Sequence, residues 1–433
     1  MTRPAQARGR KPELTGTSRV TDAKPALDGV RSVLRRRGFV PVWGVLLVLT
    51  LLTAAGYRLH TRLGYGLLLL SVFLFGLSHG AVDHLLVRRL LTPAGPATEA
   101  VDTGRRATGN TAGTRILGRR LGRRLSRFAR AYPLATVGVV YLLLGGTYLG
   151  CWLVEPAAAF VLFVCLTAAH WGLGDLYSLV AVDRAGHLRT RGERLLVAAV
   201  RGAIPMLVPL LAHPDEFRRV ATLVVEAVDP TASSGLAGLF TLSTRLTIGA
   251  CFGLLLATTL VLGARRGANR DDSSRADSRR DDSSRADSRR DDSSRADSRR
   301  DDSSRADWLF DAGETLLLVG FFAVVPPVVA IGVYFPLWHS LRHVFRLELL
   351  DPPAVAGFER GRLVPGLVRF ARDAAPLTAV ALVFMGGLFL ALPAARLTLS
   401  GTVAVYLVLL AVLTLPHAAI AAWADLAQGV WSR

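Results

Sequence analysis

AAAFVLFVCLTAAHWGLGDLYSLVAV, residues 157–182, is the stretch that decides the fold. At 1.5 Å per residue a helix over this run is about 39 Å long, enough to cross the roughly 30 Å of hydrocarbon in a bilayer. Only Asp175 carries a formal charge within it. The run therefore predicts a transmembrane helix, and the ionisable side chains of His170 and Asp175 inside it then need a functional reason.

Comparable apolar runs recur along the chain and predict ten spans in all. The spans are residues 39–57, 64–87, 132–153, 157–182, 195–212, 236–264, 314–332, 334–350, 375–393 and 402–425. The seventh and eighth share one apolar run with a break expected near Gly332 and Pro336, so they form either a hairpin or one kinked helix. The runs lack the apolar/polar alternation of a membrane barrel. We therefore expect an all-α, polytopic helical membrane protein with about 8–10 transmembrane helices.

Arginine supplies almost all of the positive charge behind the net charge of +19. The basic residues lie between the apolar runs, which is typical of topology determinants and not of one continuous nucleic-acid-binding face. With the N-terminus inside, about 44 of the 52 basic residues are cytoplasmic and about five are outside. We therefore expect a multi-pass plasma-membrane protein with both termini in the cytoplasm, the lipid bilayer as its surroundings and no nucleic-acid partner.

The catalytic transmembrane domain is expected to span residues 39–425 and to contain two inserts. One insert, residues 265–307, holds three complete copies of DDSSRADSRR, each neutral and with nothing apolar to bury beyond alanine. Such a composition predicts a disordered linker. The other insert, residues 91–130, is expected to be a basic cytoplasmic loop that includes a candidate surface helix (117–130). Outside the domain we expect a disordered basic tail (1–38) and a cytoplasmic tail (426–433).

Six of the nine histidines lie within predicted spans, in four short strings. The strings are SHGAVDH (78–84), AHWGLGD (169–175), WHSLRH (338–343) and LPHAAIAAWAD (415–425). All four lie on spans that run from outside to inside in the predicted topology, with their histidines at mid-depth or somewhat cytoplasmic of it. Four separate segments therefore bring imidazoles to a similar depth, as one site between helices requires. The other three histidines, His60, His187 and His213, are predicted to be solvated loop residues.

Helical spacing sorts these histidines. His339 and His343 are four residues apart, so both project from one face and can bind one metal ion. His79 and His84 are five apart, about 140° around a helix, so they are not expected to bind the same ion. A four-nitrogen set of His79, His170, His339 and His343 follows as the predicted catalytic metal site.

The remaining polar groups of the four strings are expected to orient the ligand imidazoles, by accepting their other N–H, or to lie along a substrate channel. These groups are Asp83, His84, Asp175, His417 and Asp425. Aromatic residues beside the strings are predicted either to line the channel or to serve packing, with Tyr141 and Tyr148 as weaker candidates. These aromatic residues are Trp171, Tyr177, Tyr334 and Trp338. We expect Arg201 to extend toward an interface, while Arg342 is a candidate for a buried pair with one of the motif aspartates.

The chemistry of the predicted ligands favours Fe(II). Imidazole binds zinc, copper, iron and nickel, whereas structural zinc normally recruits thiolate, and the three cysteines show no CxxC spacing. An all-histidine site in apolar surroundings suits Fe(II) with positions open to O₂.

As a set, the strings HGAVDH, HWGLGD, WHSLRH and TLPH resemble the Brp/Blh family, the bacteriorhodopsin-related β-carotene 15,15′-dioxygenases of haloarchaea and marine bacteria. The resemblance covers residues 40–425 apart from the two inserts. It implies cleavage of the central double bond of β-carotene with O₂ to give two molecules of all-trans-retinal, and it allows a functional link to an opsin. The presumed iron ligands of the family map onto His79, His170, His339 and His343.

Other classes of protein fit the pattern less well. A bis-histidine haem protein needs histidine pairs about 14 residues apart, and no pair has that spacing. A membrane di-iron desaturase needs about eight histidines in HxxxH and HxxHH boxes, and only WHSLRH supplies an HxxxH. A metal or proton transporter is expected to contain inverted repeats, and the sequence shows no such symmetry. A non-catalytic retinal- or carotenoid-binding protein stays an alternative, and it would leave carotene uncut.

Overall fold

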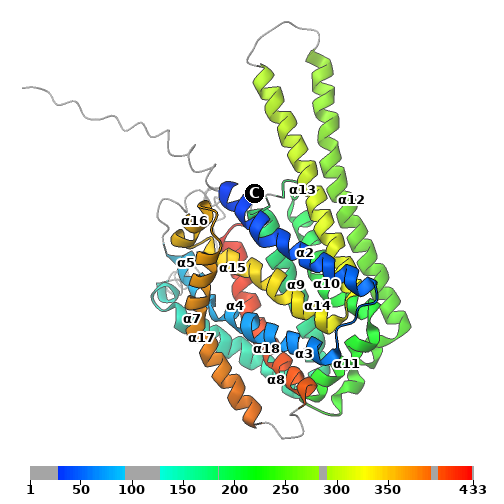
Figure 1. Ribbon diagram of the computed structural model, residues 1–433, viewed down its shortest axis with the longest axis vertical. Coiled ribbons are helices and arrows are strands. Elements are labelled where there is room, and N and C mark those ends of the chain that lie inside the picture. Colours follow the sequence, from blue (N-terminus) through cyan, green and yellow to red (C-terminus); the bar gives the residue numbers. More distant parts are fainter. Residues whose placement is uncertain (1–27, 93–126, 184, 282–289, 392–397, 432–433) are drawn as a thin grey trace, which may run out of the picture.

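Every long apolar run in the described chain is helical, because backbone hydrogen bonds must be made within the segment in a hydrocarbon environment. The structure is a computed structural model that describes residues 28–92, 127–183, 185–281, 290–391 and 398–431 (Figure 1). Within these residues there is no strand. The side chains of some described residues, His79 among them, lie outside the description.

The helices of the first half are η1 (Leu34–Phe39), α2 (Val40–Ala54), α3 (Thr61–Ser71), η2 (Val72–Gly76), α4 (Leu77–Ala81), α5 (Asp83–Leu91), α7 (Pro133–Val140), η4 (Tyr141–Gly145), α8 (Gly146–Val154), α9 (Pro156–Ala181), α10 (Arg191–Ala212) and α11 (Pro214–Glu226). Those of the second half are η5 (Ala232–Phe240), α12 (Leu242–Asp281), α13 (Arg290–Val324), α14 (Pro327–Tyr334), η6 (Phe335–Ser340), α15 (Leu341–Glu348), α16 (Pro352–Glu359), α17 (Val364–Ala391) and α18 (Leu399–Ala427). Here η marks π-helical turns, except for η5, which is a 3-10 helix.

Six helices of the described chain are long and apolar enough to cross a membrane, and the protein is accordingly a multi-pass membrane protein. They are Asp28–Ala54, Pro133–Val154, Pro156–Ala181, Arg191–Ala212, Leu242–Arg266 and Leu399–Ala427. The all-helical membrane fold predicted from the sequence is thus confirmed. The other four predicted spans also coincide with helices, in α3 to α5, α13, η6 to α15 and α17, and their crossing of the bilayer stays a prediction.

The break expected near Gly332 and Pro336 lies elsewhere. Helix α13 ends at Val324, and Pro326 adopts an extended ψ of 138° before Pro327 starts α14. A residue that precedes proline is pushed out of the helical region, so the Pro326–Pro327 pair separates two helices. Pro336 is accommodated in the π turn η6, and the helix runs on to Glu348.

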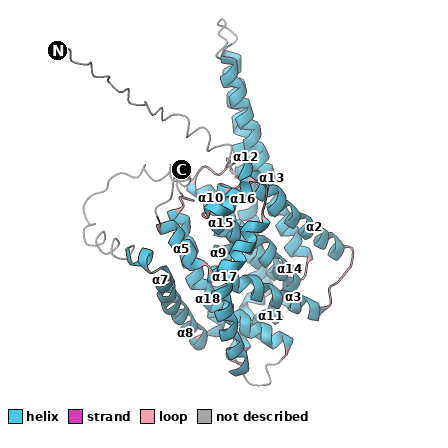
Figure 2. Ribbon diagram, turned by 60° about the vertical axis from the view of Figure 1, so that its left-hand side comes forward, coloured by secondary structure: helices cyan, strands magenta, loops and turns pink. Residues whose placement is uncertain are grey.

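Three segments expected outside the core differ in how much the structure describes. Residues 28–38 of the predicted disordered tail are helical. Most of the predicted 91–130 loop lies outside the described residues, as do 1–27. Helices α12 and α13 continue into the DDSSRADSRR repeat as a projecting hairpin (Figures 1 and 2). Each copy places Asp and Arg three or four residues apart, which supports an isolated helix; that the repeat is dispensable for activity stays a prediction.

Helices α9 and α10 pack with their backbones in close contact. A Cβ atom added to Gly172 of α9 would overlap the carbonyl oxygen of Ala198, and one added to Gly202 of α10 would overlap that of Ala168. Small residues at a crossing let two membrane helices approach backbone to backbone, where packing replaces the hydrophobic effect as the source of stability. Gly172 belongs to the AHWGLGD string, so the string serves helix packing as well as chemistry.

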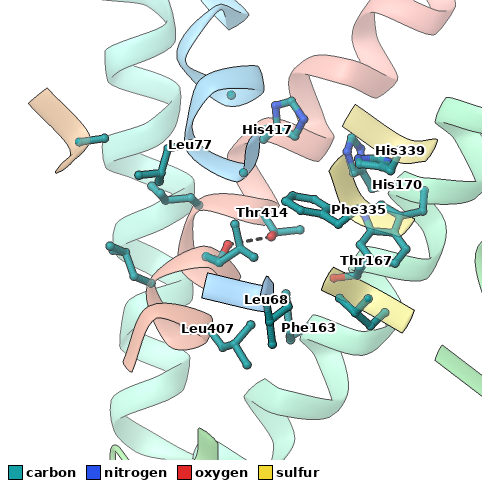
Figure 3. Close-up of a pocket in the computed structure, with 18 of the residues that line it drawn as sticks. Leu68, Leu77, Phe163, Thr167, His170, Phe335, His339, Leu407, Thr414 and His417 are labelled. Carbon is teal, nitrogen blue, oxygen red and sulfur yellow. Dashed lines mark hydrogen bonds between the residues drawn. The ribbon is translucent and has the colours of Figure 1, made fainter. Parts of the chain in front are cut away.

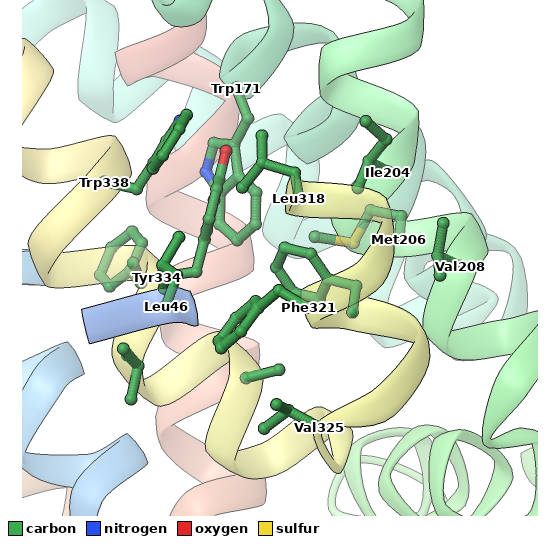
Figure 4. Close-up of a cluster of buried hydrophobic side chains, with 14 of the residues drawn as sticks. Leu46, Trp171, Ile204, Met206, Val208, Leu318, Phe321, Val325, Tyr334 and Trp338 are labelled. Carbon is green, nitrogen blue, oxygen red and sulfur yellow. The ribbon is translucent and has the colours of Figure 1, made fainter. Parts of the chain in front are cut away.

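A hydrophobic cluster anchors α2, α9, α10, α13, α14 and η6 to one another (Figure 4). Its largest fully buried side chains include Tyr334, Trp338, Phe321 and Phe322. Tyr334 packs against Trp171 and Phe322 with ring centroids 5.0 and 5.2 Å apart. Tyr334 and Trp338 are therefore packing residues of the core.

We predict that Gly172→Ala destabilises the protein by about 1–3 kcal/mol, because the added methyl group forces α9 and α10 apart. Thermal unfolding of the purified protein in detergent measures the change. Gly253→Ala on α12 is the matched control, since a Cβ there meets no atom within 4 Å. Equal unfolding temperatures for the two variants would contradict the close contact between α9 and α10.

Candidate metal centre

Four histidines from three parts of the chain converge between the helices. Helix α9 supplies His170, the η6–α15 segment supplies His339 and His343, and α18 supplies His417. One ligand atom from each of His170, His343 and His417 lies within 4.8 Å of the others, close enough to share a metal ion. The ring of His339 lies 4.9 Å from that of His170 and 4.6 Å from that of His343.

Local geometry explains how His339 and His343 reach the same point as His170. The four-residue spacing puts both imidazoles on one helix face, as the sequence predicted. Helix α9 receives them at Gly174, where an added Cβ would lie 3.0 Å from Nε2 of His343 and 3.8 Å from Cε1 of His339. The second glycine of AHWGLGD thus leaves room for the two imidazoles.

Asp83 holds the His417 ring in place. Its two carboxylate oxygens lie 3.0 and 2.9 Å from Nδ1 of His417, and the Tyr141 hydroxyl donates to Oδ2 at 2.8 Å. Because a carboxylate accepts and does not donate, Nδ1 carries the proton and Nε2 keeps the lone pair that a metal needs. Carboxylate–histidine pairs of this kind are common around metal ions. Asp83 thus contacts an imidazole, but that of His417, which was not in the predicted ligand set; its role in orienting a metal ligand stays a prediction.

His417 therefore lies close enough to His170 and His343 to share a metal ion with them, although helical spacing left it outside the predicted ligand set. No pattern within α18 reveals its neighbours, since they come from α5 and α9. The side chain of His79 lies outside the described residues, so its role as a ligand stays a prediction. Its neighbour Gly80 lies beside the centre: an added Cβ there would be 3.4 Å from the Tyr141 hydroxyl and 4.0 Å from Nδ1 of His417.

Asp175 acts on the centre in a different way from that expected. Among the described contacts it accepts a hydrogen bond not from an imidazole but from Nε1 of Trp338, at 3.0 Å to each carboxylate oxygen. It also pairs with Nε of Arg342 at 3.5 Å. Trp338 and Arg342 directly precede His339 and His343, so Asp175 positions the turn that carries these two histidines.

A buried ionic network continues from Asp175 into α10 and α13. Arg201 pairs with Asp311 at 2.6 Å, with Glu314 at 2.9 Å and with Asp175 at 3.7 Å. Arg342 also pairs with Glu314, at 2.9 Å. The expected buried pair between Arg342 and a motif aspartate is confirmed.

Two expectations about charged residues are corrected by this network. Arg201 does not extend to an interface, since only 1% of its surface is exposed. His187 is not a solvated loop residue either: it is buried, with Nε2 3.0 Å from Asp311. Asp311 and Glu314 were not among the residues predicted from the sequence. Their signal was present, because charges next to an apolar run must find partners of opposite sign.

Asp425 and Tyr177 lie in a separate cluster around Arg346. Arg346 pairs with Asp425 at 2.7 Å, and its guanidinium lies 4.4 Å from the centroid of the Tyr177 ring. Neither residue lines the cavity described below. Their predicted part in the histidine site or the channel has no contact in its favour among the described residues.

An apolar cavity of about 530 Å³ lies against the histidines (Figure 3). His170, His339 and His417 border it, and its walls are otherwise mostly aliphatic and aromatic. Of the predicted channel residues, His84 and Trp171 line the cavity, whereas Tyr177, Tyr334 and Trp338 do not. Tyr141, considered a weaker candidate, lines it as well.

A family model and individual relatives point to the same family. A family model described as "Beta-carotene 15,15'-dioxygenase" matches residues 119–425. The probable beta-carotene 15,15'-dioxygenase Blh of Halobacterium salinarum is 35% identical over 94% of this chain and 97% of its own. The probable beta-carotene 15,15'-dioxygenase Brp of the same species is 30% identical over 72% of this chain and 79% of its own. No solved structure matches the chain.

We predict that Asp83→Asn lowers metal affinity about 10–100-fold, because the amide neither fixes the His417 tautomer nor raises the basicity of its ring. The measurement is metal per protein after dialysis against graded chelator. Asp215→Asn, at an exposed position in the first turn of α11, is the control. Unchanged retention in Asp83→Asn would exclude His417 from the centre.

Proposed function

Because the chain belongs to the β-carotene 15,15′-dioxygenase family, we propose that its histidine group holds a catalytic iron and that the apolar cavity beside it holds the carotenoid. The chain is a membrane-embedded enzyme that cleaves β-carotene at the 15,15′ double bond. Splitting one C=C bond into two aldehydes needs two oxygen atoms. One O₂ supplies both without an external reductant, so the proposed products are two molecules of all-trans-retinal.

The observation that carries the proposal is that three of the clustered histidines, His170, His339 and His417, border a cavity whose walls are mostly aliphatic and aromatic. β-Carotene is a hydrocarbon, so it offers no hydrogen bonds or charges for recognition. An apolar pocket of matching shape is the kind of site that can hold it. Imidazoles at the edge of such a pocket have no role in binding a hydrocarbon, and a metal gives them one.

The metal is proposed to be Fe(II). Its ligands are taken from the predicted set of His79, His170, His339 and His343, and His417 is an alternative ligand for one coordination position. The donor set fits iron, since imidazole is a good ligand for it and no described cysteine borders the cavity. When bound, iron would supply the activation of O₂ that a spin-paired polyene requires.

The residues of the chain then serve to position the substrate and the ligands. Asp83 holds His417, and Asp175 holds the turn before His339 and His343 through Trp338 and Arg342. Trp171 lies 5.2 Å from the His339 ring and walls the cavity beside it. Placing one double bond at a fixed point is the main contribution of a protein to such a reaction.

The depth of the cavity supports cleavage away from the polyene ends. Helix α9 carries both His170 and Phe160, which lines the cavity ten residues earlier, about 15 Å along the helix axis. Phe160 and Val224 are buried and line this end of the cavity. One ring of β-carotene resting there would leave the scissile bond near the histidines and not at the ring.

We further propose a plasma-membrane location with both termini in the cytoplasm, supported by the distribution of basic residues. The C-terminal end of the described chain lies near the start of the Asp28–Ala54 helix, at one end of the bundle (Figure 1). Retinal is an aldehyde of use to an opsin, and a functional link to one is part of this proposal.

Bacteria that accumulate β-carotene are predicted to lose their colour and form retinal when they express the protein. Retinal is assayed by chromatography under iron-replete and chelated conditions. His343→Ala is expected to stay orange, whereas His60→Ala, which changes an exposed histidine between α2 and α3, is expected to bleach like the wild type. Orange cells with well-expressed wild-type protein would instead favour a carotenoid-binding or metal-transporting protein.

A second prediction concerns the ligands. Iron per protein is expected to fall at least about ten-fold in His170→Ala, His343→Ala and His417→Ala, because each removes a convergent nitrogen. Iron content by elemental analysis reports this without reference to activity. Full iron content in His417→Ala, with loss in His79→Ala, would restore the ligand set expected from helical spacing.

A further inference from the structure

The cavity reaches the outer surface of the bundle between α7 and α17. Leu134 of α7 and Val380 of α17 both line it, yet they are 54% and 64% exposed. Gly138, one turn after Leu134 on the same face of α7, also lines it and is exposed. A Cβ added to Gly138 meets no atom within 4 Å, so there is open space at this point.

The opening and the histidines belong to one cavity. Gly80 and Ala81 of α4, and then His84, line the cavity together with Leu134 and Val380. A Cβ added to Gly80 would lie 3.4 Å from the Tyr141 hydroxyl and 4.0 Å from Nδ1 of His417. Two residues with little or no side chain, Gly80 and Ala81, therefore form part of the cavity wall beside His417.

The surface around the opening is apolar. On α7 and the turn after it, Val139 and Leu142 are 51% and 75% exposed, and on α17 Val383 is 76% exposed. In a bilayer such residues face lipid tails. A molecule in the hydrocarbon layer can pass this opening without leaving an apolar environment, whereas a route from water would require it to be dissolved there first.

We propose that β-carotene enters the enzyme sideways from the lipid, through a portal formed by Leu134 and Gly138 on α7 and by Leu377 and Val380 on α17. This inference rests on the proposed function, since it names the route of the same substrate to the same centre. One ring passes the histidines and reaches the inner end of the cavity at Phe160. The other half of the polyene follows and lies between the histidines and the portal.

The test narrows the portal from both sides with Gly138→Trp combined with Val380→Trp. The matched control is Gly146→Trp combined with Val368→Trp, at exposed positions on α8 and α17 that do not line the cavity. Two rates are measured in vesicles that contain β-carotene. One is loading of β-carotene onto iron-depleted protein, read by recovery of the bound carotenoid; the other is retinal formation by the iron-loaded protein.

Loading and retinal formation are both expected to slow at least about five-fold in the portal variant and to stay at wild-type rates in the control. Only the portal variant narrows the route by which the substrate enters. A smaller effect on loading, with folding and iron content normal, would overturn the portal. Wild-type protein that loads β-carotene but forms no retinal would contradict the proposed function while leaving the portal supported. The two failures are thus distinguishable.

Discussion

A charge inside a lipid-embedded bundle must be neutralised by a partner, and the pairing of Asp175 with Arg342 and Arg201 is the interaction on which the rest of this structure depends. Asp175 lies on α9, Arg201 on α10 and Arg342 on α15, and Glu314 and Asp311 bring in α13. Leaving any one of these charges alone in a low-dielectric interior is strongly unfavourable. The network therefore sets which faces of four helices meet, and through Trp338 it sets the position of the turn that carries His339 and His343.

The glycines of AHWGLGD make that arrangement sterically feasible. Gly172 lets α9 contact α10 at backbone distance, and Gly174 leaves space for His343. On either side of the two glycines lie His170, Trp171 and Asp175, which respectively reach the centre, wall the cavity and join the network. One turn and a half of helix thus combines packing, metal binding and charge neutralisation, which explains why the string is so compact.

The two sides of the histidine group differ sharply in polarity. On one side lies the ionic network with Asp175, Arg342 and Glu314; on the other lies the apolar cavity. A hydrocarbon substrate needs the second side, because desolvated charges would have no partner there. The histidines need the ionic network, because imidazoles at the edge of the cavity must be held in place by protein groups and not by the substrate. His417, held by Asp83 and Tyr141, repeats the principle with a hydrogen-bonded carboxylate in place of an ion pair.

The sequence by itself determined the helical membrane architecture, the strings that bear the histidines and the shared face of His339 and His343. These features are local: span length follows from bilayer thickness, and neighbours on a helix follow from its 3.6-residue repeat. Only the tertiary structure decided that His417 meets His170 and His343, that Asp175 holds Trp338 instead of an imidazole, and that Arg201 is buried. Each of these depends on which face of one helix packs against another, and residues on different helices, far apart in the sequence, carry no periodic signal of their contact.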